Sequence, residues 1–155
     1  MPATIELTLN DNGSLKALTD LAAAGADLSP VMKEISGILA DASEQAFANE
    51  ADPTTGESWQ PLTEAHKGYR QSKGYTGSIL QMSGQLAASI QSDHGRDFAQ
   101  VGSNKVYAAI HQHGGLPDMR PANAAIPARP FLGASEDDKD EIMEVLARHL
   151  SDAIR

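Results

Sequence analysis

Cysteine is absent from the 155-residue chain, so the sequence offers no disulfide framework, no thiolate metal site and no cysteine nucleophile. The N-terminal residues MPATIELTLN contain no basic stretch followed by an apolar one. Nowhere in the sequence do about 18 apolar residues run together, as a membrane-spanning helix requires. These absences predict a soluble protein that is neither exported nor embedded in a membrane.

Basic residues are also scarce, because 12 Lys and Arg stand against 21 Asp and Glu, for a net charge of −9. Residues 1–60 carry 2 basic and 10 acidic side chains, residues 61–133 carry 7 and 4, and residues 134–155 carry 3 and 7. Tight nucleic-acid binding needs a basic surface that displaces counterions from phosphate, so the overall balance disfavours it. Only the middle block is basic.

Common catalytic signatures are missing as well. The sequence has no Gly-x-Ser-x-Gly nucleophile elbow, and the glycines of residues 68–77 lack the Gly-Lys-Ser/Thr ending of a phosphate-binding loop. We therefore assign no catalytic residue, no cofactor and no metal.

The first half of the chain shows one strand pattern and two helix patterns. Apolar and polar residues alternate over 4–10, which predicts a half-buried strand, and residues 14–22 then predict a short helix. Ser29 as the N-cap and Pro30 at the first helical position announce a longer helix that ends at about Asn49. Its apolar residues recur at three- and four-residue spacing, so we expect it to be the main core helix.

The second half predicts a hairpin and a C-terminal helix. Ser83 can cap a short helix, and residues 89–92 and 98–102 flank a polar tip in the manner of a β-hairpin. Ser135 and Asp138 have the spacing of a capping box at the start of the last helix.

A segment rich in glycine and proline lies between the hairpin and the last helix. It begins with Gly114 and Gly115, contains four prolines, and closes on the apolar pair Phe131 and Leu132. Proline removes a backbone donor and fixes φ, so residues 114–130 are predicted to be an extended assembly loop.

Together these patterns predict a single α+β domain spanning residues 1–155. A small antiparallel sheet, made of the N-terminal strand and the hairpin, packs against the long central helix and the C-terminal helix.

The only tryptophan, Trp59, stands beside Pro61 and Leu62 in a loop-like stretch. Trp59 and Leu62 either plug the edge of the core or contact a partner, since tryptophan is enriched at interface hot spots.

Lys67, Arg70 and Lys73 alternate with aromatic residues. The pattern fits a solvated basic loop or short helix, a contact with an acidic protein, or a nucleic-acid-binding protein whose bases stack on the aromatic rings.

His111 and His113 are two residues apart, the spacing at which an extended segment presents two imidazoles to one metal ion, and Asp118 could be a third ligand. A metal-binding hydrolase is therefore an alternative. On a helix, residues two apart point away from each other.

Several short motifs occur in an order that is similar to that of a known family. They are Trp59-Gln60-Pro61-Leu62, Ile79-Leu80, Ser83-Gly84-Gln85-Leu86, Ser89-Ile90, Val101-Gly102-Ser103-Asn104, Tyr107 to Gln112, Gly114-Gly115 and Ile126 to Gly133. The chain thus resembles the virion morphogenesis proteins of tailed phages and Mu-like prophages, also called tail completion proteins. The resemblance covers roughly residues 31–150, and its most specific piece is Pro127 to Gly133.

The resemblance implies a structural protein, without enzymatic activity, that completes the tail, joins it to the head, or does both. It implies a ring of identical subunits in the neck or at the tail end, of which a hexamer is one form. Implied partners are the tail tube or terminator protein and the head connector, with phage DNA close by and no membrane. The location is the virion, after synthesis in the host cytoplasm.

We expect oligomer and partner contacts at Trp59, Leu62, Tyr107, His111, Gly114, Gly115, Pro127, Arg129, Pro130 and Phe131. The guanidinium of Arg129 offers a planar fork to a carboxylate of a neighbouring subunit. A basic middle block facing an acidic terminal helix of the next subunit would hold a head-to-tail ring together. Changing Arg129 to Glu is then expected to weaken the ring while leaving the monomer folded.

Overall fold

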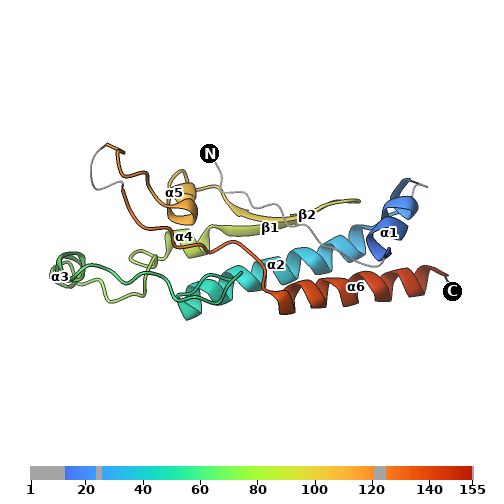
Figure 1. Ribbon diagram of the computed structural model, residues 1–155, viewed down its shortest axis with the longest axis horizontal. Helices are drawn as coiled ribbons and strands as arrows, with labels where there is room; N and C mark the ends of the chain where they lie inside the picture. The colour runs from blue at the N-terminus through green and yellow to red at the C-terminus, as the bar shows by residue number, and fades with distance from the viewer. Residues whose placement is uncertain (1–12, 24–25, 121–124, 155) are drawn as a thin grey trace.

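The computed structural model describes residues 13–23, 26–120 and 125–154 and has the predicted α+β architecture. The molecule is elongated, with two long helices side by side and a two-stranded antiparallel hairpin along them (Figure 1). The strand predicted over residues 4–10 lies outside the described residues. Within the described ranges, no helix combines the length and the apolar character needed to cross a bilayer.

The central helix α2 spans Ser29–Asn49, as the apolar periodicity predicts. Its N-cap is Leu28, so the prediction that Ser29 is the cap is wrong by one residue. The Ser29 hydroxyl instead donates to Asp27 Oδ1 at 2.6 Å. At the other end Glu50 is left-handed, with φ 51° and ψ 45°, and its N–H bonds to the carbonyl of Ala46.

The C-terminal helix α6 spans Glu136–Ile154 and begins with the predicted capping box. Asp138 N–H donates to Ser135 Oγ at 3.1 Å, and Asp138 Oδ2 accepts from Ser135 N–H at 2.8 Å. This helix lies antiparallel to α2 (Figure 1). Glu34 on α2 accepts from His149 Nε2 at 2.9 Å and also pairs with Arg148 on α6.

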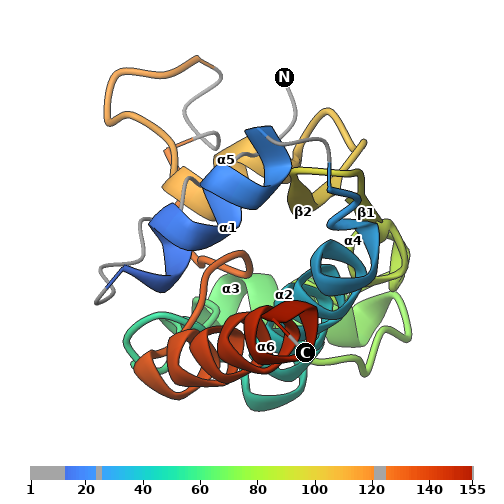
Figure 2. The same ribbon diagram turned by 90° about the vertical axis from the view of Figure 1, so that its right-hand side faces the viewer.

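One hydrophobic cluster joins α2 and α6 with the first helix, α1, which spans Ser14–Ala23. Its buried members are Leu18, Val31, Ile35, Ile38, Ile142, Val145 and Leu146. Seen along the molecule in Figure 2, α2 and α6 lie together on one side, and α1 and the hairpin lie on the other. Burial of apolar surface between these elements therefore stabilises this half of the molecule.

The hairpin pairs β1, Ile90–His94, with β2, Ala99–Ser103, in the register Ile90↔Ser103 to His94↔Ala99. Both strands contact α2, and Gly95 N–H donates to the Phe98 carbonyl at 2.9 Å across the tip. The one-turn helix α4, Gln85–Ala88, leads into β1.

The half of the molecule away from α1 and the C-terminus carries two short helices, α3 (Glu64–Ser72) and α5 (Ala108–His113) (Figure 1). A short helix around Lys67 to Lys73 was one of the predicted alternatives, whereas no helix was predicted for residues 106–113. A helix of 6 residues is too short for its apolar spacing to be distinguished from an irregular apolar segment.

The chain from Arg129 to Gly133, which we call the strap, runs through the second hydrophobic cluster without regular structure. Phe131 is 0% exposed and Leu132 1% exposed, so this apolar pair lies in the core. The ring of Phe131 lies 5.3 Å from that of Phe47 on α2, centroid to centroid. The strap therefore buries backbone polar groups that have no helix or sheet to satisfy them.

Side chains from three distant segments satisfy these groups. Trp59 Nε1 donates to the Pro130 carbonyl at 2.7 Å, and Ser43 Oγ donates to the Phe131 carbonyl at 2.7 Å. Gln112 Oε1 accepts from the N–H groups of Phe131 at 3.0 Å and Leu132 at 2.9 Å. Gln112 Nε2 donates to the Leu132 carbonyl at 3.0 Å. Trp59 thus takes the first of its two predicted roles, as part of the core.

Replacing Gln112 by Leu should destabilise the fold strongly. The change leaves two backbone donors and one acceptor of the strap buried without partners, and each such group costs about 1–3 kcal/mol. We expect the free energy of unfolding, measured by urea titration, to fall by roughly 3–5 kcal/mol. The exposed neighbour His113 provides the control, since His113→Leu should change it by less than about 0.5 kcal/mol. Similar losses for both variants would contradict the role given to Gln112.

Candidate functional site

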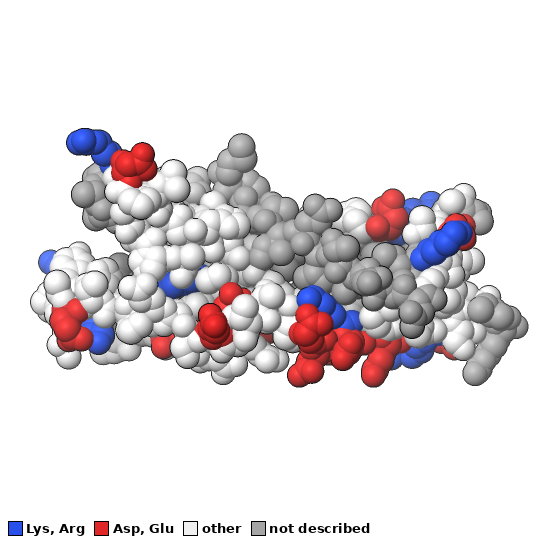
Figure 3. Space-filling view, viewed as in Figure 1, with Lys and Arg blue, Asp and Glu red and all other residues white. Residues whose placement is uncertain are grey.

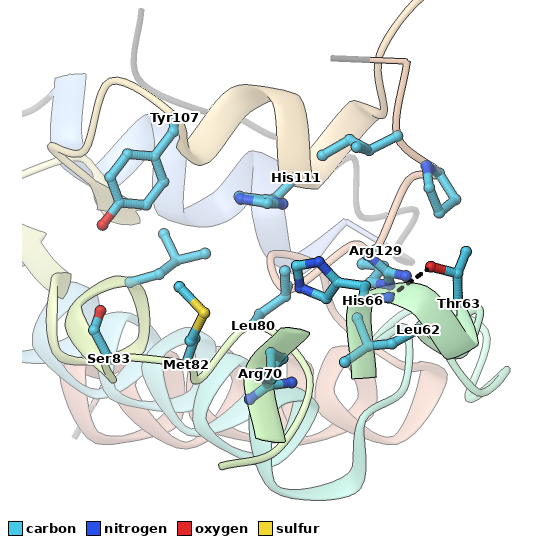
Figure 4. A pocket seen from close by; sticks show the side chains of 13 residues that line it. Leu62, Thr63, His66, Arg70, Leu80, Met82, Ser83, Tyr107, His111 and Arg129 are labelled. Carbon is cyan, nitrogen blue, oxygen red and sulfur yellow. Dashed lines mark hydrogen bonds between the residues drawn. The ribbon is translucent and has the colours of Figure 1, made fainter. Parts of the chain in front are cut away.

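A groove of about 440 Å³ opens between α3 and α5 at one end of the molecule (Figure 4). Its walls come from three separate parts of the chain. The lining residues are Leu62, Thr63, His66 and Arg70 around α3, Leu80, Met82, Ser83 and Leu86 around α4, and Tyr107, His111, Ile126, Pro127 and Arg129 from α5 and the approach to the strap.

Local capping fixes the α3 wall. Thr63 is the N-cap of α3, and its Oγ1 accepts from the N–H of His66 at 3.3 Å. His66 and Arg70 are four residues apart and therefore share one face of the helix. Arg70 Nη2 donates to the Gly77 carbonyl at 2.5 Å and to the Ser78 carbonyl at 3.2 Å, which ties the chain after α3 back to the helix.

The opposite wall is the short helix α5. Tyr107 and His111 stand four residues apart, with ring centroids 6.0 Å apart in an edge-on arrangement. The carbonyl of His111 accepts from the N–H of Arg129 at 2.8 Å. The beginning of the strap is thereby attached to this wall.

Arg129 lies at the base of the groove and is only 7% exposed. Its Nε donates to the Gln60 carbonyl at 2.9 Å, and its Nη2 donates to the Pro61 carbonyl at 3.4 Å. Two of the three guanidinium nitrogens of Arg129 therefore already donate hydrogen bonds within the subunit. Glu at this position would lose both bonds and bury a carboxylate against two carbonyls, so the expectation that Arg129→Glu leaves the monomer folded is corrected.

Burial lowers the pKa of both titratable groups at the base of this groove. For His111 the main cause is desolvation, and the positive charge of Arg129 lowers its pKa further. For Arg129 the cause is desolvation, from an ordinary value far above physiological pH. The imidazole of His111 is therefore neutral at pH 7 and faces a positive guanidinium.

Five of the predicted interface residues line this groove, namely Leu62, Tyr107, His111, Pro127 and Arg129. Two others, Gly114 and Gly115, follow α5 directly; Gly114 has φ +78°, and a Cβ there would lie 2.9 Å from the N of Ala128. Trp59 and Phe131 pack in the core, with Pro130 half-buried beside them. The contact of all ten with partners stays a prediction.

The histidine pair does not form a metal site in the described part of the chain. His111 and His113 are on the same short helix, two residues apart, so they point in different directions. His111 lines the groove, whereas His113 is exposed. Residues 13–23, 26–120 and 125–154 contain no group of three or more His, Cys, Asp or Glu that could hold a metal ion.

The three basic residues considered for nucleic-acid contact do not form one exposed surface. Lys67 is exposed and pairs with Glu64 at 2.7 Å, whereas Arg70 is 6% exposed and faces the groove. Lys73 follows the end of α3 and is exposed. Arg70 therefore does not share an exposed surface with Lys67 and Lys73, as the nucleic-acid interpretation required.

Other groove residues, among them Leu80 and Met82, were not predicted as site residues. Nothing in the local pattern marks them, because they meet only when α3, α4 and the strap assemble. The interleaved basic and aromatic residues of α3 were the only local signal.

Comparisons with known proteins agree with one another. The model of the phage virion morphogenesis family matches residues 9–151. The chain is 42% identical over 126 residues to the putative capsid assembly protein G of Escherichia phage Mu, which covers 81% of each chain. It is 38% identical over 124 residues to Mu-like prophage FluMu G protein 1 of Haemophilus influenzae, covering 79% of each. FluMu G protein 2 of Haemophilus influenzae is 36% identical over 141 residues, covering 90% of this chain and 91% of its own. No solved structure matches the chain.

The lowered pKa of His111 predicts a pH dependence of stability. The folded state resists protonation of this imidazole, whereas the unfolded state takes up the proton below about pH 6.5. The free energy of unfolding should therefore fall as the pH drops through 6.5 toward the lower folded-state value. Replacing His111 by Gln should remove part of this slope in urea titrations between about pH 8 and pH 5.

The control is His113→Gln, which removes an exposed histidine from the same helix. The other titratable groups that line the groove, His66, Arg70, Tyr107 and Arg129, are unchanged in both variants. A His111→Gln protein with the same pH slope as the wild type would show that burial of His111 does not oppose its protonation.

Proposed function

The chain belongs to the phage virion morphogenesis family, and we propose that within this assembly role it completes the tail, joins it to the head, or does both. The observation that carries the proposal is the family match over residues 9–151, together with relatives in Mu and Mu-like prophages that align over most of their length. The Mu relative is named as a putative capsid assembly protein, which also concerns virion assembly.

The surface near the groove supports a role built on contacts. Val106 is 85% exposed and Leu116 62% exposed, and Met119 and Tyr107 are also exposed. Val106 and Tyr107 directly precede α5, Leu116 and Met119 follow it, and Tyr107 also lines the groove. Apolar groups gathered on an exposed surface indicate a protein-protein interaction site.

The proposed working form is a ring of identical subunits in the neck or at the tail end. A ring forms when each subunit presents two different surfaces in a head-to-tail contact that closes. This elongated subunit has a groove and exposed apolar residues at one end, whereas acidic side chains gather along α6 (Figure 3). Two such unlike surfaces are what a head-to-tail contact requires.

The proposed partners are other copies of the chain, the tail tube or terminator protein and the head connector, in the virion. The extended loop of residues 114–130 is a candidate contact for these partners. In its described parts, 114–120 and 125–130, the loop contains neither helix nor strand. Its prolines reduce the conformational entropy that is lost on docking.

Deleting the gene for this chain from the phage that encodes it should leave filled heads and tails that are not joined, or tails with unfinished ends. We expect infectious titre to fall by several orders of magnitude, and electron microscopy of lysates should show the separated parts. A plasmid copy of the wild-type gene should restore titre, and so should one with the exposed change Glu44→Lys. Complete and infectious particles in the absence of the protein would refute the proposed function.

A further inference from the structure

The groove holds two positive side chains without any negative counterpart. Its lining includes two arginines but no Asp or Glu. Arg70 is 6% exposed and Arg129 7% exposed, yet each is bonded only to backbone carbonyls. No acidic residue in the described part of the chain pairs with either of them. A buried cation without a counter-ion is costly, so these two guanidinium groups favour the entry of an anion.

Buried hydrogen-bonding atoms without a partner belong to residues that line the same groove. Among the described residues, the buried side-chain atoms without a hydrogen-bond partner are Arg70 Nε and His111 Nδ1, and both residues line the groove. No described residue accepts a hydrogen bond from Nη1 of Arg70 or of Arg129. Arg129, His66, His111 and Arg70 all line this groove, and His66 and Arg70 are on the same helix, α3 (Figure 4). A carboxylate suits this set, because it accepts several charge-assisted bonds at once.

The last helix offers carboxylates that are equally without partners. Asp140 and Glu141 of α6 each stand three or four residues from both Asp137 and Glu144, so the four lie on one helix face, which we call the acidic stripe. All four are exposed, and none is hydrogen-bonded or paired with a described residue. The other two acidic residues at the start of α6 already have partners, since Glu136 pairs with Lys139 and Asp138 caps the helix.

We propose that the groove of one subunit binds carboxylates of the acidic stripe on a second copy of the chain. No residue of α6 lines the groove, so a stripe carboxylate reaches it from another subunit. The exposed rim residues Met82 and Tyr107 then pack against the incoming helix. Since groove and stripe are different surfaces, the contact is head-to-tail, as the ring in the proposed function requires, and the inference rests on that function.

The first test reverses charge on the stripe. The double variant Asp140→Lys, Glu144→Lys should weaken self-association by about tenfold or more in sedimentation velocity across a concentration series, because two attractive contacts become repulsive. Its matched control is Asp41→Lys, Glu44→Lys on the exposed face of α2, which changes the net charge equally. The control should associate like the wild type, and both doubles should keep the helical circular dichroism and the melting temperature of a folded chain.

The second test introduces a carboxylate into the groove from the same subunit. His66 is exposed and stands in the first turn of α3, where an acid is favourable, so His66→Asp should fold and place a carboxylate against the two arginines. This variant should melt at a higher temperature than the wild type and lose self-association. A surface change with no role in the groove would not shift both quantities in opposite directions.

Mixing the two defective proteins separates the proposal from other accounts. The stripe variant keeps an intact groove, and His66→Asp keeps an intact stripe, so one functional contact can form between them. We expect each protein alone to be a monomer and the equimolar mixture to contain a one-to-one dimer that grows no further. A mixture that stays monomeric, a wild type that is monomeric at every concentration, or a stripe variant that associates normally would each overturn the proposal.

The same variants also test whether the groove binds nucleic acid instead of a second copy of the chain. If a fluorescent DNA oligonucleotide binds the wild type with steep salt dependence, and His66→Asp loses this binding but still self-associates, the groove takes phosphate and the proposal fails. Failure of the proposed function is seen separately. Particles that are complete without the gene refute that function, whereas a stripe variant that fully complements the deletion refutes only the groove contact.

Discussion

The subunit depends on burying a stretch of irregular backbone whose polar groups are satisfied by side chains alone. The strap has no helix or sheet partner, and each unmet N–H or carbonyl at its depth would cost about 1–3 kcal/mol. Gln112, Ser43 and Trp59 supply the partners from α5, α2 and the loop after α2. Because the three segments are far apart in sequence, the strap can be buried only when all of them are in place.

The same arrangement positions the groove. Arg129 at the start of the strap bonds to the loop before α3 through its side chain and to α5 through its backbone N–H. At the other end of the strap, a Cβ on Gly133 would lie 2.3 Å from Thr54 Oγ1, so a larger residue there would force Thr54 in the loop after α2 to shift. The two walls of the groove are thus held at a fixed separation by a segment that itself forms part of the core. The groove and the core are parts of one structure, which explains why several residues predicted to contact partners are buried beneath the groove.

The sequence predicts the elements that are specified locally and misses those that depend on distant contacts. The apolar periodicity of α2, the capping box of Ser135 and the polar tip of the hairpin act within a few residues, and the structure has all three. The helix α5 is too short to show a period. The burial of Arg70 and Arg129 cannot be seen in sequence, because their acceptors are backbone carbonyls of irregular segments. Charge alone placed both arginines on the surface, whereas the fold places them in a groove.

If the strap is the constraint on which the subunit depends, its amides open only when the whole molecule unfolds. Native-state hydrogen exchange of the Phe131 and Leu132 N–H groups measures this directly, since both bond to Gln112 in a segment without regular structure. We expect both amides to exchange with the free energy of global unfolding, like those in the middle of α2. Exchange as fast as that of the exposed residues 116–120 would contradict it, because the strap would then open without disturbing the core.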